Sequence, residues 1–528
     1  MNMPMRKYPV GIQTFSEIRK GGYVYIDKTD LVWKLSHMAK YVFLSRPRRF
    51  GKSLLTTTLD SYFRGDKALF EGLKIMKLEQ EWKQYPVIHI DLSTAKNKQT
   101  PEELRRYLNL MLNRLMPQYE NKGEVLPGEK LSGMITRCYE DTGSQVVLLI
   151  DEYDSPLLDV LHDEVWISEM KLVMQEFYQP LKACESMVKF CFMTGITKFS
   201  QLSIFSTLNN IMNVSMNPEF SAICGITEEE LVTAMKEDIE KLAQYEGYTA
   251  DEMHAKLKMQ YDGYHFAKDM VEVYNPYSLM NCFAQKEVRN YWFESGTPTF
   301  LYQQMKRYNT DITSLDGVFV PDMAFDRPTE TMTDAIPLMY QSGYLTIKDY
   351  DRESQGYTLG IPNNEVRVGL VEGLIPLYSG LNSGDVQLGC AFKIWRALKN
   401  GDVDTMMREL QAYLAGVPYV EGFKKKLEDA TTKEGFYEYT LYLILSMMNV
   451  YVRTQVKCVG GRVDMVVKTA TTIYIFEFKI RENATDALRQ VDEKGYADAY
   501  LTDGRKVVKV GVRFDTDKLT IKDWQIAN

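Results

Sequence analysis

Short apolar segments alternate with stretches of helical periodicity over the first 225 residues of the chain. Four of these segments are predicted to be strands: Tyr41–Leu44, Val87–Asp91, Val146–Ile150 and Lys189–Met193. They are mostly continuous apolar runs, as expected for strands that are buried on both faces. Such strands, separated by helices, indicate a parallel sheet with helices on both sides, which is an α/β architecture.

The pattern changes at about Thr227, where a threonine followed by three glutamates is typical of a helix N-terminus. Helical stretches then dominate to about Tyr340. Around residues 336–362 a helix precedes two strand-like segments, Ser342–Ile347 and Tyr357–Ile361, with a polar turn between them. This order is compatible with a winged helix, and also with a β-hairpin in a helical domain that has no role with nucleic acid.

The last part of the chain returns to strands. Ser379–Asp385 is rich in glycine and serine, and we interpret it as a linker. Helical patterns continue from there to about residue 450. Four strand-like segments follow, with one helix at about 484–498 before the last of them: Val450–Lys457, Arg462–Lys468, Thr472–Lys479 and Val507–Phe514. The pattern therefore predicts three domains, with boundaries at 1–225, 226–380 and 381–528.

Composition limits the protein class without indicating a partner. The 528 residues are 45% hydrophobic and 25% charged, which excludes wholesale disorder, collagen and coiled coil. The net charge of −8 excludes a uniformly basic coat for nucleic acid but leaves room for a local groove. The longest aliphatic runs are of strand length, so we expect no membrane span. The seven cysteines are scattered without a C-x-x-C pair, and we expect reduced thiols in a cytoplasmic protein.

A phosphate-binding motif follows the first predicted strand. Residues 45–53 read Ser-Arg-Pro-Arg-Arg-Phe-Gly-Lys-Ser, and a helical segment follows them. A strand, then Gly-Lys-Ser, then a helix is the setting of a Walker A loop, whose backbone N–H groups hold phosphate oxygens. Lys52 would reach the β- and γ-phosphates and Ser53 would hold Mg²⁺. The predicted cofactors are therefore ATP and Mg²⁺, bound by Gly51, Lys52, Ser53 and Leu54.

The motif departs from the standard pattern at its first glycine, which is replaced by Arg46. A glycine there normally permits a turn and a close approach of the backbone. Arg46, Arg48 and Arg49 crowd the loop, and three roles stay open for them: neutralising phosphate charge, binding a partner, or lying in solvent. We include Arg48 and Arg49 among the candidate nucleotide-binding residues.

Two other strand ends supply candidates for the same site. The aliphatic strand Val146–Ile150 runs into Asp151 and Glu152, as in a Walker B strand. Asp151 would hold Mg²⁺ through water or Ser53, and Glu152 would be catalytic by polarising the attacking water. The alternative is a buried strand that ends in an exposed acidic turn. Thr194, at the end of the fourth strand, is either a sensor of the γ-phosphate or part of a turn.

The C-terminal strands carry a second group of polar residues. Asp464 lies in the segment Gly461–Val467, and Glu477 and Lys479 lie at the end of Thr472–Lys479. Glu477 and Lys479 share one face of their strand, because side chains alternate between faces. Two carboxylates and a lysine suit a Mg²⁺ ion that takes hard oxygen ligands and phosphate oxygens. Such an ion activates water, while Lys479 would position that water.

This arrangement is the loose signature of PD-(D/E)XK nucleases, and an exposed hairpin with the same residues is the alternative. Two more side chains extend the candidate site. Glu434, on the helix predicted before the strands, is a candidate additional metal ligand, with Glu438 as a second choice. Gln490, on the helix after the strands, could face the site. The candidate catalytic residues here are Asp464, Glu477, Lys479 and Gln490, and the candidate metal ligands are Asp464, Glu477 and Glu434.

Several motifs of this chain occur together in one known family. In the N-terminal part they are Tyr25–Thr29, Arg46–Ser53, Leu149–Asp154, Thr194–Ile196 and Phe205–Asn210. In the C-terminal part they are Gly461–Asp464, Phe476–Lys479, Ala487–Gln490 and Lys494–Tyr496. The chain thereby resembles, over nearly its whole length, the AAA-ATPase-like family of gut-type anaerobic bacteria. Its members typically carry a C-terminal PD-(D/E)XK domain, and an arginine in place of the first Walker glycine is typical of them.

The resemblance implies an α/β protein with a P-loop NTPase core and a parallel sheet in residues 1–225. A helical or winged-helix-like connector at 226–380 and an α/β restriction-endonuclease-like domain at 381–528 would follow. It also implies that the segment with Asp27 and Thr29 lies against the adenine.

Two functions of different classes follow. In the first, the chain is an ATPase whose nucleotide state gates Mg²⁺-dependent cleavage of nucleic acid, DNA rather than RNA. In the second, it is an ATP-dependent switch or a module that binds nucleic acid or protein, with an inactive nuclease fold. The net charge of −8 and the missing glycine favour the second. No membrane partner is expected, and oligomerisation is left open.

Overall fold

The computed structural model describes most of the chain in two compact units. The described residues are 6–527 except 96–97, 99, 120–122, 159, 161–162, 198–210, 294–298, 309, 311–314, 327–333, 371–392, 395, 399, 416–440, 443–444, 446–450, 459–460, 470, 501, 516–517 and 519. The first unit comprises residues 1–310 and 317–365, and the second comprises 311–316 and 366–528. The predicted linker Ser379–Asp385 and the family motif Phe205–Asn210 lie outside the described residues.

A parallel five-stranded sheet forms the centre of the first unit, in the order β2-β3-β4-β1-β5. Its strands are β1 (Tyr41–Ser45), β2 (Val87–Asp91), β3 (Val146–Asp151), β4 (Val188–Gly195) and β5 (Met212–Asn213). The predicted α/β fold and its four strands are confirmed, whereas the two-residue β5 was not predicted. Since the strands are parallel, their carboxyl ends lie at one edge, where ligands bind in open α/β sheets.

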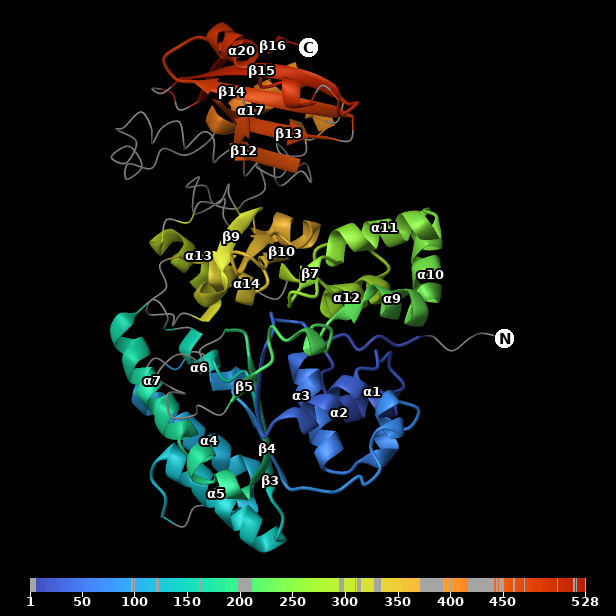
Figure 1. Cartoon of the computed structure of the whole chain (residues 1–528), viewed down its shortest axis with the longest axis vertical. Coiled ribbons are helices and arrows are strands. Elements are labelled where there is room, and N and C mark those ends of the chain that lie inside the picture. Colours follow the sequence, from blue (N-terminus) through green and yellow to red (C-terminus); the bar gives the residue numbers. More distant parts are fainter. Residues whose placement is uncertain are drawn as a thin grey trace. The chain divides into compact units, whose positions relative to one another are not determined.

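Helices cover both faces of this sheet, as Figure 1 shows. On one side lie α1 (Phe15–Gly21), α2 (Thr29–Met38) and α3 (Lys52–Phe63). On the other lie α4 (Pro101–Leu115), α5 (Pro127–Thr142), α6 (Ser155–Leu158), α7 (Glu164–Tyr178) and α8 (Pro180–Ala183). In α4 the buried leucines are Leu104, Leu108 and Leu112, one turn apart, so a single stripe of the helix faces the core.

Residues 226–361 of the first unit contain helices and two small antiparallel sheets. The helices are α9 (Glu228–Ala234), α10 (Lys236–Glu246), α11 (Ala250–Tyr261), α12 (Pro276–Gln285), α13 (Thr299–Arg307) and α14 (Ile336–Gln341). The sheet β6-β8-β7 consists of β6 (Ile226–Thr227), β7 (Tyr264–His265) and β8 (Glu272–Tyr274). The sheet β10-β11-β9 consists of β9 (Val318–Pro321), β10 (Thr346–Asp351) and β11 (Gly356–Gly360).

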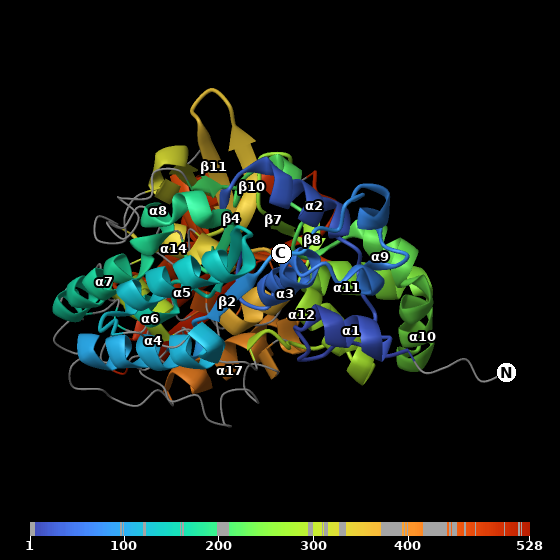
Figure 2. The same cartoon turned by 90° about the horizontal axis from the view of Figure 1, so that it is seen from below.

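The structure contains both local features that the pattern predicted in this region. Thr227 caps α9 in a capping box with Glu230: the Thr227 hydroxyl accepts from the Glu230 N–H, and the Glu230 carboxylate accepts from the Thr227 N–H. The predicted hairpin is present as β10 and β11, and it protrudes in the view of Figure 2. Because residues 226–365 belong to the same compact unit as the parallel sheet, the three-domain division stays a prediction.

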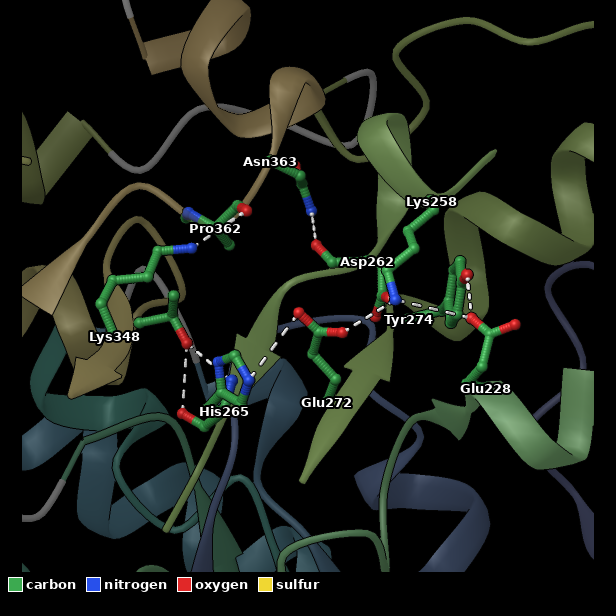
Figure 3. Close-up of polar contacts among 10 residues, drawn as sticks. Glu228, Lys258, Asp262, His265, Glu272, Tyr274, Lys348, Pro362 and Asn363 are labelled. Atoms are coloured by element: carbon green, nitrogen blue, oxygen red, sulfur yellow. Dashed lines mark hydrogen bonds and ion pairs between the residues drawn. The ribbon is translucent and has the colours of Figure 1, made fainter. Parts of the chain in front are cut away.

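A buried carboxylate, Asp262, lies in a polar cluster at the end of α11 (Figure 3). Lys258 Nζ lies 3.7 Å from an Asp262 carboxylate oxygen, 3.1 Å from Glu272 and 3.9 Å from Glu228. The Asn363 amide donates to the Asp262 carbonyl over 2.7 Å. Burial, with smaller effects of Glu272 and Glu228 opposed by Lys258, raises the pKa of Asp262 from 3.8 to about 7.

Asp262→Asn is expected to stabilise the protein at alkaline pH. The folded state holds the Asp262 proton more tightly than the unfolded chain, so the free energy of unfolding falls as the pH rises from about 4 to about 7. Asparagine removes the buried charge, and we expect a gain of about 1–3 kcal/mol above pH 7 and little change near pH 4. Thermal unfolding at both pH values measures the difference. Exposed Asp251→Asn is the control, and equal destabilisation at both pH values would contradict the prediction.

The second unit is built on a mixed five-stranded sheet in the order β12-β13-β14-β15-β16. Its strands are β12 (Tyr451–Cys458), β13 (Gly461–Lys468), β14 (Thr472–Lys479), β15 (Lys506–Asp515) and β16 (Thr520–Ala527). Only β14 and β15 pair in parallel, as their connection through α20 (Ala484–Glu493) requires. The four predicted strands are present, and β16 is an addition. Helix α17 (Val403–Ala415) packs against β16.

Helix α20 lies unusually close to the sheet at Gly511 of β15. A Cβ atom at Gly511 would lie 2.2 Å from the carbonyl oxygen of Ala484, so only glycine fits at this crossing. Ala487 and Val491 are buried on the same helix. This close packing carries the other residues of α20, among them Gln490, to the carboxyl end of β14.

Among the residues that the structure describes, no helix is long and apolar enough to cross a membrane.

Candidate functional site

The first candidate site is the loop between β1 and α3. Gly51 is the N-cap of α3 and has a φ of 89°, in the left-handed region that favours glycine. A Cβ atom at Gly51 would meet no atom within 4 Å, so the backbone conformation rather than space requires glycine there. The Gly51-Lys52-Ser53 motif therefore starts α3 as the sequence predicts, with the first N–H groups of the helix at the loop.

Lys52 is buried and folded onto the loop itself. Its ammonium donates to the carbonyl oxygens of Arg46 and Pro47, over 2.9 Å and 3.0 Å. Burial lowers the pKa of Lys52, and the nearby carboxylates of Glu152 and Asp151 partly oppose this effect. These two carbonyls are weak partners for a charge compared with a phosphate, so a bound anion can draw the ammonium away from them.

Asp151 and Glu152 lie at the end of β3, which β4 separates from the loop strand β1. Asp151 is buried, and burial raises its pKa, whereas a hydrogen bond from the Ser53 hydroxyl lowers it. Glu152 has a φ of 50°, which turns the chain sharply after Asp151. The Ser155 hydroxyl donates to the Glu152 carboxylate over 3.0 Å. The structure thus brings Lys52, Ser53, Asp151 and Glu152 together, as predicted.

A pocket of about 380 Å³ opens beside this loop. Its lining includes Glu152 and several of the predicted nucleotide-binding residues: Arg48, Arg49, Gly51, Lys52, Ser53 and Leu54. Residues from four other segments contribute to its wall: 9–13, 24–28, 223–226 and 276–281. Only the second of these overlaps a family motif, and the pattern of the others carries no signal, because their residues are mainly apolar.

The remaining predictions for this site differ in outcome. Thr194 is fully buried on β4 and does not line the pocket, and within the described part of the chain its hydroxyl has no hydrogen-bond partner. Tyr25, Ile26 and Lys28 line the pocket, but Asp27 does not: its carboxylate accepts from Thr29 and from the Lys74 N–H and so braces the start of α2. The segment therefore lies at the pocket, and its expected position against the adenine stays a prediction.

Of the three roles considered for Arg46, lying in solvent is wrong, because the side chain is buried. It is 1% exposed and donates to the backbone carbonyls of Ser45, Ser215 and Phe220, away from the pocket. An arginine with these contacts neither lies in solvent nor is placed to touch a phosphate. Arg48 and Arg49, by contrast, line the pocket, and the Arg49 guanidinium lies 4.4 Å from the ring of Tyr277.

The second candidate site lies in the second unit, where β13, β14 and α20 meet. Glu477 and Lys479 come from β14 and lie on one face, with Lys479 Nζ 3.2 Å from a Glu477 carboxylate oxygen. Lys479 also donates to the Gln490 carbonyl oxygen over 2.6 Å. The Gln490 amide donates to the same oxygen of Glu477. Asp464 of β13 accepts from the Phe478 N–H over 2.7 Å.

The carboxylates of this site are held in an electrostatically unfavourable position. Glu477 is 2% exposed, and burial raises its pKa to about 7, with Asp464 adding to the rise and Lys479 opposing it. Its second oxygen, Oε2, is buried and has no hydrogen-bond partner among the residues that the structure describes. A buried acceptor without a donor is costly, and a bound cation would remove that cost.

The donor set fits a hard divalent cation with few protein ligands. Asp464 and Glu477 offer carboxylate oxygens, and Mg²⁺ is commonly held by one or two carboxylates while it keeps several waters. No group of three or more metal-binding side chains occurs in the described part of the chain. Glu434 and Glu438, the candidate additional ligands, lie outside it. At the first site, the Ser53 hydroxyl and the Asp151 carboxylate likewise offer hard oxygen ligands that suit Mg²⁺.

Gln455 is a neighbour of the second site that the sequence did not indicate. It lies on β12 opposite Asp464, has a φ of 50°, and its amide lies 3.5 Å from the Asp464 carboxylate. A glutamine within a strand carries no local signal, so only the pairing of β12 with β13 identifies it.

Comparisons with known proteins agree with this division into two sites. A family model described as "Predicted AAA-ATPase" matches residues 9–205, and one described as "PD-(D/E)XK nuclease superfamily" matches residues 432–524. The "Uncharacterized protein in vnfD 5'region" of Azotobacter chroococcum mcd 1 is 32% identical over 530 residues, which span 98% of each chain. The solved structure of the Aeropyrum pernix ORC2 protein (ADPNP-ADP complexes) is similar over 65% of this chain and 90% of that chain, with 11% identity. Its TM-score of 0.26 is too low to carry an argument.

Proposed function

Because this chain belongs to the AAA-ATPase-like family that carries a C-terminal PD-(D/E)XK nuclease-superfamily domain, we propose that it is an ATP-dependent nuclease. The observation that carries the proposal is the contact of Glu477, Lys479 and Gln490 around one carboxylate oxygen, next to Asp464. An exposed hairpin with the same residue types would not bury Glu477. A divalent ion bound there would lower the pKa of a water molecule and offset the charge of a phosphodiester.

The residues of the second site have separable roles in this proposal. Asp464 and Glu477 hold the cation through their carboxylates. Lys479 positions a nucleophilic water and offsets charge that develops on the phosphate, because its ammonium lies beside Glu477. Gln490 donates to Glu477 and accepts from Lys479, so it orients both groups.

The first site supports the ATP-dependent part of the proposal. Lys52, Gly51 and the start of α3 hold the phosphates, while Ser53 and Asp151 provide oxygen ligands for Mg²⁺. Glu152 lies where it can polarise a water for hydrolysis, since it lines the same pocket. The nucleotide state is proposed to control cleavage at the second site. Use of ATP and the expected reduced cysteines fit a cytoplasmic protein, with DNA as the more favoured substrate.

One assay on the full chain tests this function. Single- and double-stranded DNA and RNA are incubated with Mg²⁺ or Mn²⁺, with and without ATP, and cleavage products are counted. We expect cleavage that requires the metal and changes with ATP. No cleavage under any of these conditions would overturn the proposal and leave the switch or binding module. Metal binding by calorimetry separates the two further, because only the nuclease needs a site that Asp464→Asn removes.

A further inference from the structure

Arg46, the residue in place of the first Walker glycine, is one of the largest fully buried side chains of the described chain. One of its terminal nitrogens donates to the carbonyls of Ser45 and Ser215, over 2.9 Å and 2.7 Å, and the other donates to Phe220 over 2.8 Å. Its guanidinium carbon lies 4.3 Å from the ring centroid of Phe266. Arginine is suited to such a place, because its planar fork satisfies several acceptors and stacks on an aromatic face.

The rest of the loop is held by the same part of the chain. The ring of Phe50 packs edge-on against Tyr264 and Phe266, with centroids 4.7 Å and 5.3 Å apart. The indole N–H of Trp292 donates to the Arg48 carbonyl over 3.1 Å. Side chains from residues 264–292 therefore contact the phosphate loop at Phe50 and at the Arg48 carbonyl. These contacts do not involve Lys52.

The segment 264–266 has a second contact on its other side. The His265 N–H donates to the Thr346 hydroxyl of β10 over 2.7 Å, and this hydroxyl donates back to the His265 carbonyl. Tyr264 and Phe266 meet the loop through their rings, while the backbone of His265 meets Thr346 of the hairpin β10–β11. The segment thus lies between the phosphate loop and this hairpin.

We infer that Arg46 is a positioning residue that couples nucleotide binding at the loop to the segment 264–266 and the hairpin β10–β11. The inference rests on the proposed ATP-binding function. It names the residues of the first unit through which ATP binding would affect the hairpin. To reach a phosphate, Lys52 must leave the carbonyls of Arg46 and Pro47, so the backbone at these two residues loses the hydrogen bonds that hold it. A packed interior transmits such a shift, whereas glycine at position 46 would have no side chain to transmit it. Arginine at this position is then a functional feature rather than a defect of the motif.

The test is amide hydrogen exchange of the full chain with and without ATP, together with ATP affinity. In the wild type we expect ATP to change exchange in residues 264–274 and 346–360 by about fivefold or more. Tyr264 and Phe266 do not line the pocket, so direct contact with ATP does not account for a change there. Without nucleotide, Arg46→Gly is expected to raise exchange in residues 214–223, because the bonds to Ser215 and Phe220 are lost.

Arg46→Gly restores the standard Walker pattern, yet we expect it to abolish the ATP-induced change in residues 264–274. Phe266→Leu removes the aromatic face and leaves the backbone, so it should reduce the same change even if Arg46→Gly fails to fold. Arg64→Gly, a partly exposed arginine at the other end of α3, is the matched control. An ATP-induced change in exchange as large as in the wild type in both Arg46→Gly and Phe266→Leu would overturn the inference. So would a wild type that binds ATP without any change in exchange at residues 264–274. A wild type that binds no ATP would instead overturn the proposed function.

Discussion

Lys479→Ala is expected to reduce nucleic-acid cleavage by about 100-fold or more, while ATP binding stays unchanged. The Lys479 ammonium lies 3.2 Å from Glu477 and 2.6 Å from Gln490, so its removal takes the only positive charge from the contacts described at this site. In the metal-free protein the buried Glu477 then lacks the ammonium that opposes the effect of Asp464, and the pKa of Glu477 rises further. Product formation under single-turnover conditions with saturating Mg²⁺ measures the loss.

The matched control for this experiment is Lys506→Ala. Lys506 is exposed at the start of β15, at the opposite end of the β14–β15 pair from Lys479. The Lys506→Ala substitution removes one positive charge from the same unit without changing the site, so cleavage should stay near the wild-type rate. Cleavage by Lys479→Ala at the rate of Lys506→Ala would show that the catalytic assignment of Lys479 is incorrect.

Lys52→Ala is expected to weaken ATP binding by about 100-fold, because its ammonium supplies the direct charge for the phosphates. The free protein should lose little stability: Lys52 is buried, and burial already disfavours its charge. The measurement is the rise in thermal unfolding midpoint on adding ATP, which follows from binding to the folded state. We expect a clear rise in the wild type and almost none in the variant.

Two companion variants make the Lys52 experiment decisive. Exposed Lys67→Ala, just beyond the end of α3, should keep the full ATP-induced rise. Glu152→Gln should also keep it but slow ATP turnover, since Glu152 is proposed to act on water rather than on binding. If Lys52→Ala loses ATP binding while cleavage with ATP matches the wild type, then the nucleotide does not control the nuclease.

Local patterns were sufficient for strands β1 to β4 and β12 to β15 and for the residues that follow them, but not for β16. Strands β1 to β4 and β14 are mostly runs of apolar residues, whereas β12, β13 and β15 alternate apolar with polar residues over part of their length. Both patterns are visible in a window of five to eight residues. The residues of both sites lie within or next to these strands, so their proximity follows once the sheet type is known. The two-residue strands β5 to β7 have no such signal, and they form only because neighbouring strands supply the hydrogen-bond partners.

The sequence alone determined which polar groups make up the two candidate sites: Gly51-Lys52-Ser53 and Asp151-Glu152 at strand ends, and Asp464, Glu477 and Lys479 on adjacent strands. Each of these groups is contiguous or separated by one turn, so spacing is enough to bring its members together. Only the tertiary structure decided what surrounds them. Arg46 is buried rather than at a phosphate, and Gln455 lies beside Asp464, because each place depends on contacts between distant segments. Such contacts depend on the packing of the whole chain, which local periodicity does not encode.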